Sequence, residues 1–438
     1  MDIKNRFQNA YEELEDAVKR RNERQVYTCL GYSSNLDVLL DFKAEKLNEM
    51  LAGYLPDEGY QDMKNAGIIQ NVQDLLHTIV YFCTNGIGGE ADITDPSLIF
   101  ENFAYSYGMG GTAVQAAMAL SKVGGHSVVH LTDDSQEVLD ILDSPFIHAA
   151  DPEGRLCRTR DIKGHNPQEL HFILQFKKGD VIRTAGQETE IPCSNRLILT
   201  RNTVNETLPL WEPFFRWTEE HAQQVTSNVL SSFNAITDPA VLLKRLEFVK
   251  RHAQVYHQNN PDGIIYFEDA HYHNAEVRGI CMDTVYPHVD IMSMNEEELQ
   301  YTLEQMFLYR LDIDDIIECV QGAEFLMKRY TVRKGIVVHT KDYAMFVGAP
   351  GNVDIESGLI FGAVMATAKA MFGGYGGEKE IREVLKLPLS EKGLRNREVI
   401  MNSPWKDRVK IVPTCYIDKP KYTIGLGDSF TAGVQLCF

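Results

Sequence analysis

The chain has 438 residues, which is long enough for one large domain or for a main domain with a smaller one. Hydrophobic residues make up 44% and charged residues 24%, ordinary values for a globular protein. The formal net charge of −19 argues against electrostatic binding to nucleic acid or to an anionic membrane.

The N-terminal segment 1–25 is charged and helical in period, and it lacks the apolar core of a signal peptide. We find no uninterrupted apolar stretch of the length that spans a bilayer. The eight cysteines are scattered without a Cys-x-x-Cys pair, as is typical of buried, reduced thiols. These features predict a cytoplasmic protein.

Strand and helix patterns alternate along the chain, which favours an α/β fold with a doubly wound, mostly parallel sheet flanked by helices. Compact runs rich in β-branched residues predict strands at 26–31, 127–131, 263–267, 289–293, 335–340 and 409–413. Helical periodicity predicts helices over 110–123, 239–252, 295–309, 314–329 and 359–371, and from 428 to the end.

Two stretches, 37–107 and 151–199, are richer in turns and in polar alternation than the rest of the chain. Within the second, segment 171–186 predicts two short strands joined at Lys178-Gly179. We expect the two stretches to form a smaller, inserted α/β lid domain. Residues 1–36, 108–150 and 200–438 would then form the large nucleotide-binding α/β domain.

Near the C-terminus, a strand-like run leads into Gly425-Leu-Gly427-Asp428 and then into a helical pattern. Glycines let the backbone approach a phosphate closely, and the N–H groups and dipole of the new helix attract that anion. Asp428 could there accept the proton of an attacking hydroxyl. The tetrapeptide alone also fits a glycine turn in which Asp428 is an ordinary N-cap.

A second motif, Asn295-Glu-Glu-Glu298, follows the strand predicted at 289–293. Its two end residues share one face of a first helical turn. They fit a helix cap with a reciprocal glutamate. They also fit a carboxylate that faces Mg²⁺ through water, since this ion keeps much of its hydration shell.

Together these motifs resemble the ADP-dependent glucokinases and phosphofructokinases of the ribokinase-like superfamily. The matching blocks, in family order, are 31–37, 109–111, 194–198, 286–299, 338–340, 361–363, 409–414, 419–421 and 425–428. They cover nearly the whole chain from residue 31. The resemblance implies transfer of the β-phosphoryl group of ADP to a hydroxyl of a hexose or hexose phosphate, with AMP as product and Mg²⁺ or another divalent cation as cofactor.

The resemblance also implies roles for residues at matching positions. The catalytic residues would be Asp428 as base, Gly425, Gly427 and Arg196, whose fixed charge would reach the nucleotide phosphates. The nucleotide contacts would be Asn295, His339, Val412, Pro413 and Ile424. Glu268 and Glu298 would serve the metal.

On the acceptor side, Asn35 and Asp37 would hold sugar hydroxyls, since alternate strand positions share a face. Gly110 and Gly111 would bring helix N–H groups against the sugar.

Two residues of the expected lid favour different acceptors. Glu90 resembles the glutamate with which the glucokinases accept sugar hydroxyls, and it favours glucose or a bifunctional enzyme. Lys177 resembles the lysine that binds the phosphate of fructose 6-phosphate in the phosphofructokinases, although it also fits a solvated turn. The acceptor stays open between glucose, fructose 6-phosphate and another sugar.

Three positions depart from the family pattern. Tyr266 replaces the histidine of the family's His-x-Glu, which ends here at Glu268. Thr112 stands where glucokinases have glutamine, and Ser232 stands where the family usually has glycine. His271 and His273 lack partners at a zinc spacing, so we expect them in a loop near the substrate cleft.

Two other classes remain possible from the residues. Nothing physical dictates ADP, so an ATP-dependent ribokinase-like kinase is the first alternative. A non-catalytic sugar-binding relative is the second, and the joint retention of Asp428, Glu298, Glu268 and Arg196 argues against it. The expected partners are a small sugar and a nucleotide, with no nucleic acid and no membrane, in a monomer or small homo-oligomer.

Overall fold

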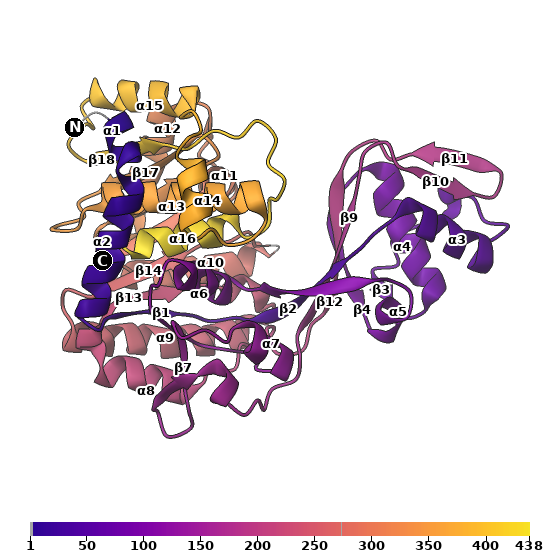
Figure 1. Cartoon of the computed structure of the whole chain (residues 1–438), viewed down its shortest axis with the longest axis horizontal. Coiled ribbons are helices and arrows are strands. Elements are labelled where there is room, and N and C mark those ends of the chain that lie inside the picture. The colour runs from indigo at the N-terminus through magenta and orange to yellow at the C-terminus, as the bar shows by residue number, and fades with distance from the viewer. Residues whose placement is uncertain (1–2, 273) are drawn as a thin grey trace. The chain divides into compact units, whose positions relative to one another are not determined.

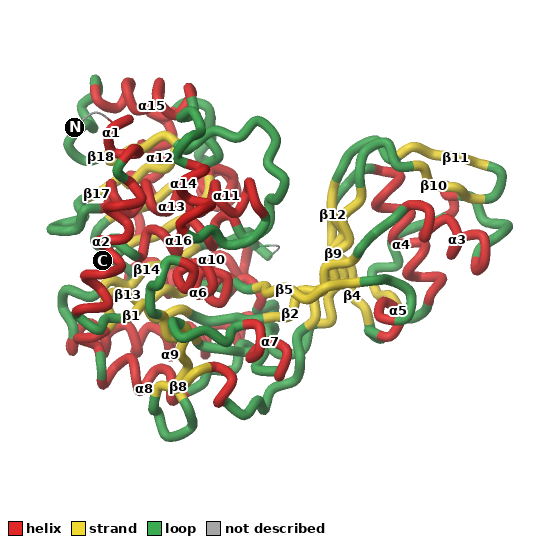
Figure 2. The backbone as a smooth tube through the Cα atoms, in the orientation of Figure 1, coloured by secondary structure: helices red, strands yellow, loops and turns green. Residues whose placement is uncertain are grey.

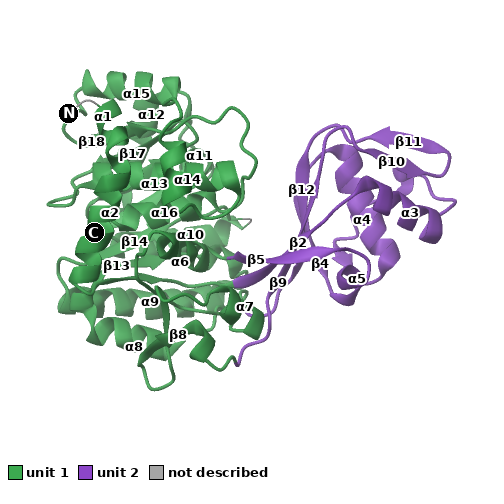
Figure 3. Cartoon of the chain, in the orientation of Figure 1, with its two compact units in different colours: residues 1–34, 111–164, 205–438 green, residues 35–110, 165–204 purple. Residues whose placement is uncertain are grey.

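The computed structural model describes residues 3–272 and 274–438, so His273 lies outside the described residues. The chain divides into two compact units (Figure 3). The larger unit comprises residues 1–34, 111–164 and 205–438, and the smaller unit comprises 35–110 and 165–204. Residues 151–164, which the sequence analysis assigned to the lid, belong to the larger unit because Leu156–Arg158 (β8) pairs with Ile147–Ala150 (β7) of its sheet.

The larger unit is built on a ten-stranded sheet in the order β18-β17-β16-β15-β14-β13-β1-β6-β7-β8. The other strands are β1 (Tyr27–Leu30), β6 (Ser127–Val129), β13 (Val225–Leu230), β14 (Ile264–Glu268), β15 (Ile291–Asn295), β16 (Gly335–His339), β17 (Tyr343–Gly348) and β18 (Val409–Pro413). Figure 1 labels β18, β17, β14, β13, β1 and β7 of this sheet. All neighbours from β16 to β7 are parallel, whereas β17 is antiparallel to both of its neighbours. The predicted mostly parallel α/β sheet is confirmed.

Helices surround this sheet (Figure 2). They are α1 (Ile3–Gln8), α2 (Ala10–Glu23), α6 (Thr112–Lys122), α7 (Gln136–Ile141), α8 (Glu212–Glu220), α9 (Pro239–Asn259), α10 (Ala275–Val285), α11 (Glu296–Phe307), α12 (Ile316–Tyr330), α13 (Ile355–Phe372), α14 (Glu378–Val384), α15 (Glu391–Met401) and α16 (Leu426–Gln435). Short 3₁₀ turns lie at Tyr60–Asp62, Thr159–Asp161, Ala222–Gln224, Phe233–Ala235 and Tyr286–His288. Each predicted strand and helix has a counterpart here, and the helix predicted to end at residue 252 continues to Asn259.

Local signals set several helix starts. The Asp238 side chain accepts the N–H groups of Ala240 and Val241, and Pro239 occupies the first helical position of α9, as predicted. Asn295 caps α11 in the same way. The Asn295 cap places the first turn of α11 directly after the end of β15, where a doubly wound fold presents its ligand sites.

The two faces of the central strands differ in chemistry. Phe267 of β14 and Met294 of β15 belong to a hydrophobic core that also contains residues of α8–α12. On the opposite face, Glu268 accepts a hydrogen bond from Thr431 of α16, and the His339 ring lies 4.8 Å from that of Phe430. Because successive strand residues alternate between faces, the polar strand ends point toward α16.

The smaller unit has a six-stranded sheet in the order β3-β4-β12-β9-β2-β5 and a two-stranded ribbon, β10-β11. Its strands are β2 (Asn35–Leu40), β3 (Ile68–Ile69), β4 (Gly89–Ile93), β5 (Tyr105–Gly110), β9 (Leu170–Phe176), β10 (Val181–Thr184), β11 (Gln187–Glu190) and β12 (Asn195–Arg201). Its helices are α3 (Ala44–Tyr54), α4 (Val72–Asn85) and α5 (Ser97–Phe100). A smaller α/β unit was expected, but the pairing within it differs.

The two strands predicted on either side of Lys178-Gly179 do not pair with each other. The first, β9, pairs with β2 and β12, whereas the second, β10, pairs with β11. The hairpin turn lies instead between β10 and β11, where Gly186 has φ +66°. This left-handed backbone conformation favours glycine and suits a tight hairpin turn.

Helix α13 is long and apolar enough, by length and composition, to cross a membrane, whereas the sequence analysis found no such stretch. The structure buries 78% of this helix. It packs against α2, α14 and α16 within the larger unit. Such burial is typical of a core helix.

A buried ion pair lies directly beside the end of β14. Arg278 donates to Asp269 over 3.0 Å, and neither side chain is exposed. Tyr286 donates a second hydrogen bond to the same carboxylate oxygen at 2.6 Å. Removal of one partner of such a pair leaves an uncompensated buried charge.

We therefore expect Arg278→Met to lower the free energy of unfolding by about 3–5 kcal/mol. Urea-induced unfolding would measure it. The exposed Arg310→Met is the control and should change the value by less than about 0.5 kcal/mol. Equal effects of the two substitutions would contradict this account of the pair.

Candidate active site

A cavity of about 530 Å³ in the larger unit lies where β14, β15 and β16 end and α16 begins. One wall carries Glu268, Asp269, Asn295, Glu298 and His339. The cavity is also lined by residues of α6, α13, the loop after β18 and the start of α16: Thr112, Thr367, Ala370, Thr414, Cys415, Thr423, Gly425, Leu426, Gly427 and Asp428. Parallel strands that end at one edge of the sheet bring these distant residues together.

Glu268 is 6% exposed and is held from two sides. One carboxylate oxygen lies 3.1 Å from His339 Nε2, and the other accepts a 2.7 Å hydrogen bond from Thr431. Burial alone would lower the pKa of His339, but its hydrogen bond to Glu268 and the neighbouring carboxylate charges raise that pKa above its usual value. The family's His-x-Glu motif has its histidine two residues before the glutamate, and here that position is the fully buried Tyr266. The histidine that contacts Glu268 is instead His339 of β16.

Asn295 and Glu298 form a reciprocal capping box. Each side chain accepts the other residue's backbone N–H at 2.8 Å. Both residues also line the cavity, so the two interpretations of this motif are compatible. Burial, followed by the charges of Asp269 and Glu268, raises the pKa of Glu298 to about 8.

This carboxylate cluster fits a hard divalent cation. Among residues 3–272 and 274–438, no three carboxylate, imidazole or thiol groups are placed to hold a metal ion by themselves. Mg²⁺ usually binds through one or two carboxylates together with water and phosphate oxygens, so a complete protein cage is not required. Burial and the charges of Asp269 and Glu268 disfavour the ionised form of Glu298, and a cation beside it would stabilise that form.

The opposite wall is the turn that begins α16. Gly425 caps the helix with φ +68°, a conformation that favours glycine. A Cβ on Gly427 would lie 3.4 Å from the His339 ring and 4.0 Å from Glu268, so the turn closely approaches the acidic wall. The N–H groups of the first turn of α16 are free of intrahelical partners by geometry and are suited to bind phosphate.

Asp428 stands in the first turn of α16 and is half-buried. Burial raises its pKa, while a hydrogen bond from Thr112 and the positive charge of Lys369 oppose that shift without cancelling it. A carboxylate with a raised pKa is a better proton acceptor than a solvated one. Thr112, a departure from the family pattern, is therefore a direct neighbour of the expected base.

In the smaller unit, several expected acceptor residues share one sheet face. Asn35 and Asp37 alternate on β2, and Asn35 donates to Asp37 over 2.7 Å. A Cβ on Gly110 would overlap both side chains, at 2.1 and 2.4 Å, so only glycine fits opposite them. The strand register places Glu90 of β4 and Arg196 of β12 on that same face.

Other expected site residues lie beside the cavity wall or outside it. Val412 and Pro413 end β18 directly before the lining residues Thr414 and Cys415, and Ile424 stands between Thr423 and Gly425. Lys177 is exposed in the turn after β9. Gly111 has φ +97° and begins α6 in the larger unit.

Ser232 stands where the family usually has glycine, and it adopts a backbone conformation that favours glycine. Its φ is +74°, in the left-handed region. Its hydroxyl accepts a 2.7 Å hydrogen bond from Ser33. This bond helps to hold a serine in a conformation that is uncommon for residues other than glycine.

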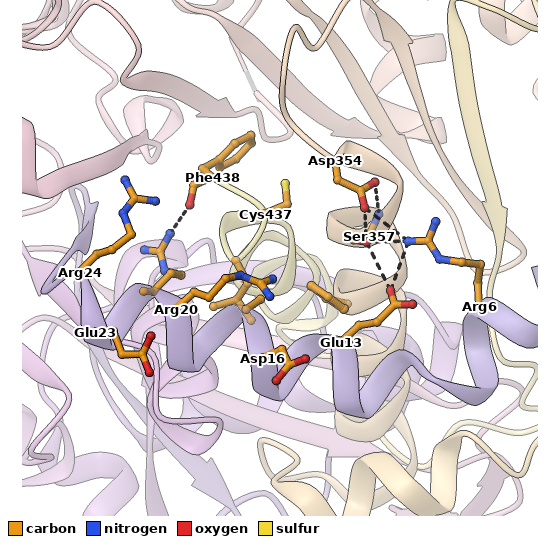
Figure 4. Close-up of a pocket in the computed structure, with 14 residues that line it drawn as sticks. Arg6, Glu13, Asp16, Arg20, Glu23, Arg24, Asp354, Ser357, Cys437 and Phe438 are labelled. Carbon is orange, nitrogen blue, oxygen red and sulfur yellow. Dashed lines mark hydrogen bonds and ion pairs between the residues drawn. The ribbon is translucent and has the colours of Figure 1, made fainter. Parts of the chain in front are cut away.

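A second cavity, of about 600 Å³, lies between α2, the start of α13 and residues 436–438 (Figure 4). Its charges neutralise one another: Arg6 lies 3.3 Å from Glu13 and 3.6 Å from Asp354, and it donates to Ser357 at 2.6 Å. Its lining contains no glycine, so it does not resemble the phosphate-binding turn of the first cavity.

Comparison with known proteins agrees with this geometry. The model of the ADP-specific phosphofructokinase/glucokinase conserved region matches residues 27–436. The chain belongs to this family. An ADP-dependent glucose/glucosamine kinase of Pyrococcus abyssi is 24% identical over 454 residues, which cover 97% of this chain and 96% of that protein.

Two solved structures share the fold. A phosphofructokinase from Pyrococcus horikoshii OT3 with AMP has a TM-score of 0.78 and 19% identity, over 94% of this chain and 97% of that one. An ADP-dependent kinase in complex with fructose-6-phosphate and ADPβS has a TM-score of 0.73 and 18% identity, over 99% and 97%. This chain is an ADP-dependent sugar kinase, a phosphotransferase that acts on an alcohol group.

Sequence reasoning missed Thr431, which holds Glu268. It lies at the fourth position after Gly427, and helical spacing would have placed it on the inner face of α16.

Asp428→Asn should lower kcat by about 10²–10⁴ because the shape is retained and the proton acceptor is lost. Equilibrium binding of AMP should be nearly unchanged. In the native enzyme, kcat should fall on acidification at a pH above the ordinary range of an aspartate, since the base must be unprotonated and burial raises its pKa. A variant that turns over within tenfold of wild type would contradict the assignment.

Glu298→Gln should raise the Mg²⁺ concentration needed for half-maximal activity by about tenfold or more, because a carboxylate that fits the cation is lost. Glu297→Gln, one residue away and more exposed, is the matched control. Activity measured against Mg²⁺ concentration distinguishes the two. Full activity in excess chelator would show that no divalent cation is used.

Proposed function

We propose that this enzyme transfers the β-phosphoryl group of ADP to a hydroxyl of a hexose, with Asp428 as the general base. The observation that carries the proposal is the convergence, in one cavity, of a glycine turn at a helix N-terminus, a half-buried aspartate and a cluster of carboxylates. The turn suits a phosphoryl group, the aspartate suits a proton, and the cluster suits a divalent cation.

In the proposed reaction, the N–H groups that begin α16 hold the transferring phosphoryl group in line with the acceptor hydroxyl. Asp428 accepts the hydroxyl proton as the new bond to phosphorus forms, while the bond between that phosphorus and the bridging oxygen of ADP breaks and AMP leaves. Glu268 and Glu298 would hold Mg²⁺, which supplies positive charge to the phosphate oxygens when bound. Arg196 contributes a fixed positive charge to the same oxygens.

The remaining residues of the proposal contact the sugar or the nucleotide; they include Asn35, Val412, Pro413 and Ile424. Asn35 and Asp37 bind sugar hydroxyls, with Gly110 and Gly111 supplying close backbone approach. Asn295, His339 and the residues around β18 contact the nucleotide, supported by the position of Thr414 and Cys415 in the cavity wall. A cytoplasmic location and a monomeric or small homo-oligomeric state belong to the same proposal.

Glucose is the acceptor that the smaller unit supports best. Glu90 lies on the sheet face of Asn35 and Asp37, where its carboxylate and that of Asp37 suit hydroxyl groups and would repel a phosphate dianion, although Arg196 on the same face would attract one. Fructose 6-phosphate is the second candidate, and the exposed cation Lys177 favours it.

The experiment measures kcat/KM with ADP for glucose and for fructose 6-phosphate in Glu90→Ala and Lys177→Ala. Glu90→Ala should weaken glucose use about 10–100-fold, since a hydrogen bond to a charged group is lost, and should weaken fructose 6-phosphate use less. Lys177→Ala should have the opposite bias. Lys178→Ala is the neighbouring control. If both substitutions shift the two sugars equally, neither residue sets the acceptor.

A further inference from the structure

Lys369 is a buried cation in a helix that is otherwise almost wholly apolar. It stands near the end of α13, in the segment LIFGAVMATAKAMF, and is 6% exposed. A buried ammonium group is costly unless fixed partners replace its water. Packing alone therefore does not explain why a lysine stands at this position.

Two side chains fix the Lys369 ammonium group. Its Nζ donates to Gln115 Oε1 over 2.8 Å, and it lies 3.7 Å from the centroid of the Tyr375 ring. Tyr375 also donates its hydroxyl to the same Gln115 oxygen at 3.1 Å. Gln115 belongs to α6, so three separate segments hold one positive charge in place.

This charge rests directly against the glycine turn of the active site. A Cβ on Gly425 would lie 2.8 Å from Lys369 Nζ and 2.0 Å from Gln115 Oε1. Lys369 and Gln115 are not among the residues that line the cavity, whereas Gly425 to Asp428 are. The ammonium group therefore stands behind the turn and reaches the cavity only through it.

We propose that Lys369 is a positioning residue for phosphoryl transfer, which fixes the Gly425 turn from behind and places a positive charge next to Asp428 and the transferring phosphoryl group. The proposal rests on the function proposed above. The lowering effect of Lys369 on the pKa of Asp428 is consistent with this placement. A role in packing alone would need no charge, because a methionine fills a similar volume.

The test compares Lys369→Met with Lys369→Arg and with Lys379→Met, an exposed lysine on α14. Lys369→Met should lower kcat by about 10–100-fold, because a misplaced turn costs rate, while the Kd for AMP changes by less than about threefold. Lys369→Arg should recover at least part of the rate, since the charge is restored. Lys379→Met should equal wild type.

If Lys369→Met matches Lys379→Met in kcat, the inference fails even though the enzyme is active. If wild type and Lys379→Met transfer no phosphoryl group from ADP to any sugar, the proposed function fails instead. If Lys369→Met does not fold, Gln115→Met decides: it removes the acceptor that fixes the ammonium group. A fall in kcat at constant Kd for AMP supports the inference, and an unchanged kcat overturns it.

Discussion

Three carboxylates at one edge of a parallel sheet impose the constraint on which the rest of the site depends. Glu268, Asp269 and Glu298 come from the ends of β14 and β15, where removal from water makes each negative charge costly. Asp269 is paired with the buried Arg278, although burial still raises its pKa. Glu268 is stabilised by His339, whose pKa it raises in return. The sheet order, with β14, β15 and β16 adjacent and parallel, makes these contacts possible.

Glu298 is the third carboxylate, and burial and the charges of Asp269 and Glu268 disfavour its ionised form. Among the described residues it accepts the backbone N–H of Asn295, and its pKa stays raised to about 8. Across the cavity, the first turn of α16 and the charge of Lys369 supply a positive field. A phosphoryl group with a divalent cation would bridge the two walls, so each wall lacks what the ligand provides.

The sequence predicted the main architecture because covered parallel strands and capped helices leave strong local patterns. Glu298 could be found for the same reason, since it stands at the junction between β15 and α11. Asp428 was found from the glycine turn that begins α16, although a loop precedes that turn where the sequence predicted a strand-like run. The two strands predicted on either side of Lys178-Gly179 are present as β9 and β10, but the sequence did not predict their partners, because pairing depends on distant segments, which β9 finds in β2 and β12. The contacts of Lys369 with Gln115 likewise join residues 254 positions apart, which no local pattern reveals.

The central claim, that the cavity lacks one positive charge until a cation binds at Glu298, is tested most directly by the protons released on Mg²⁺ binding. Calorimetric titration at pH 7 with ADP present and no sugar, in two buffers of different ionisation enthalpy, measures that number. The raised pKa of Glu298 keeps this carboxyl group largely protonated at pH 7, so the account predicts release of up to about one proton more per ion from the native enzyme than from Glu298→Gln, in which only the phosphate of ADP can still lose a proton. Mg²⁺ binding without proton release in the native enzyme, or with equal release in the variant, would contradict it.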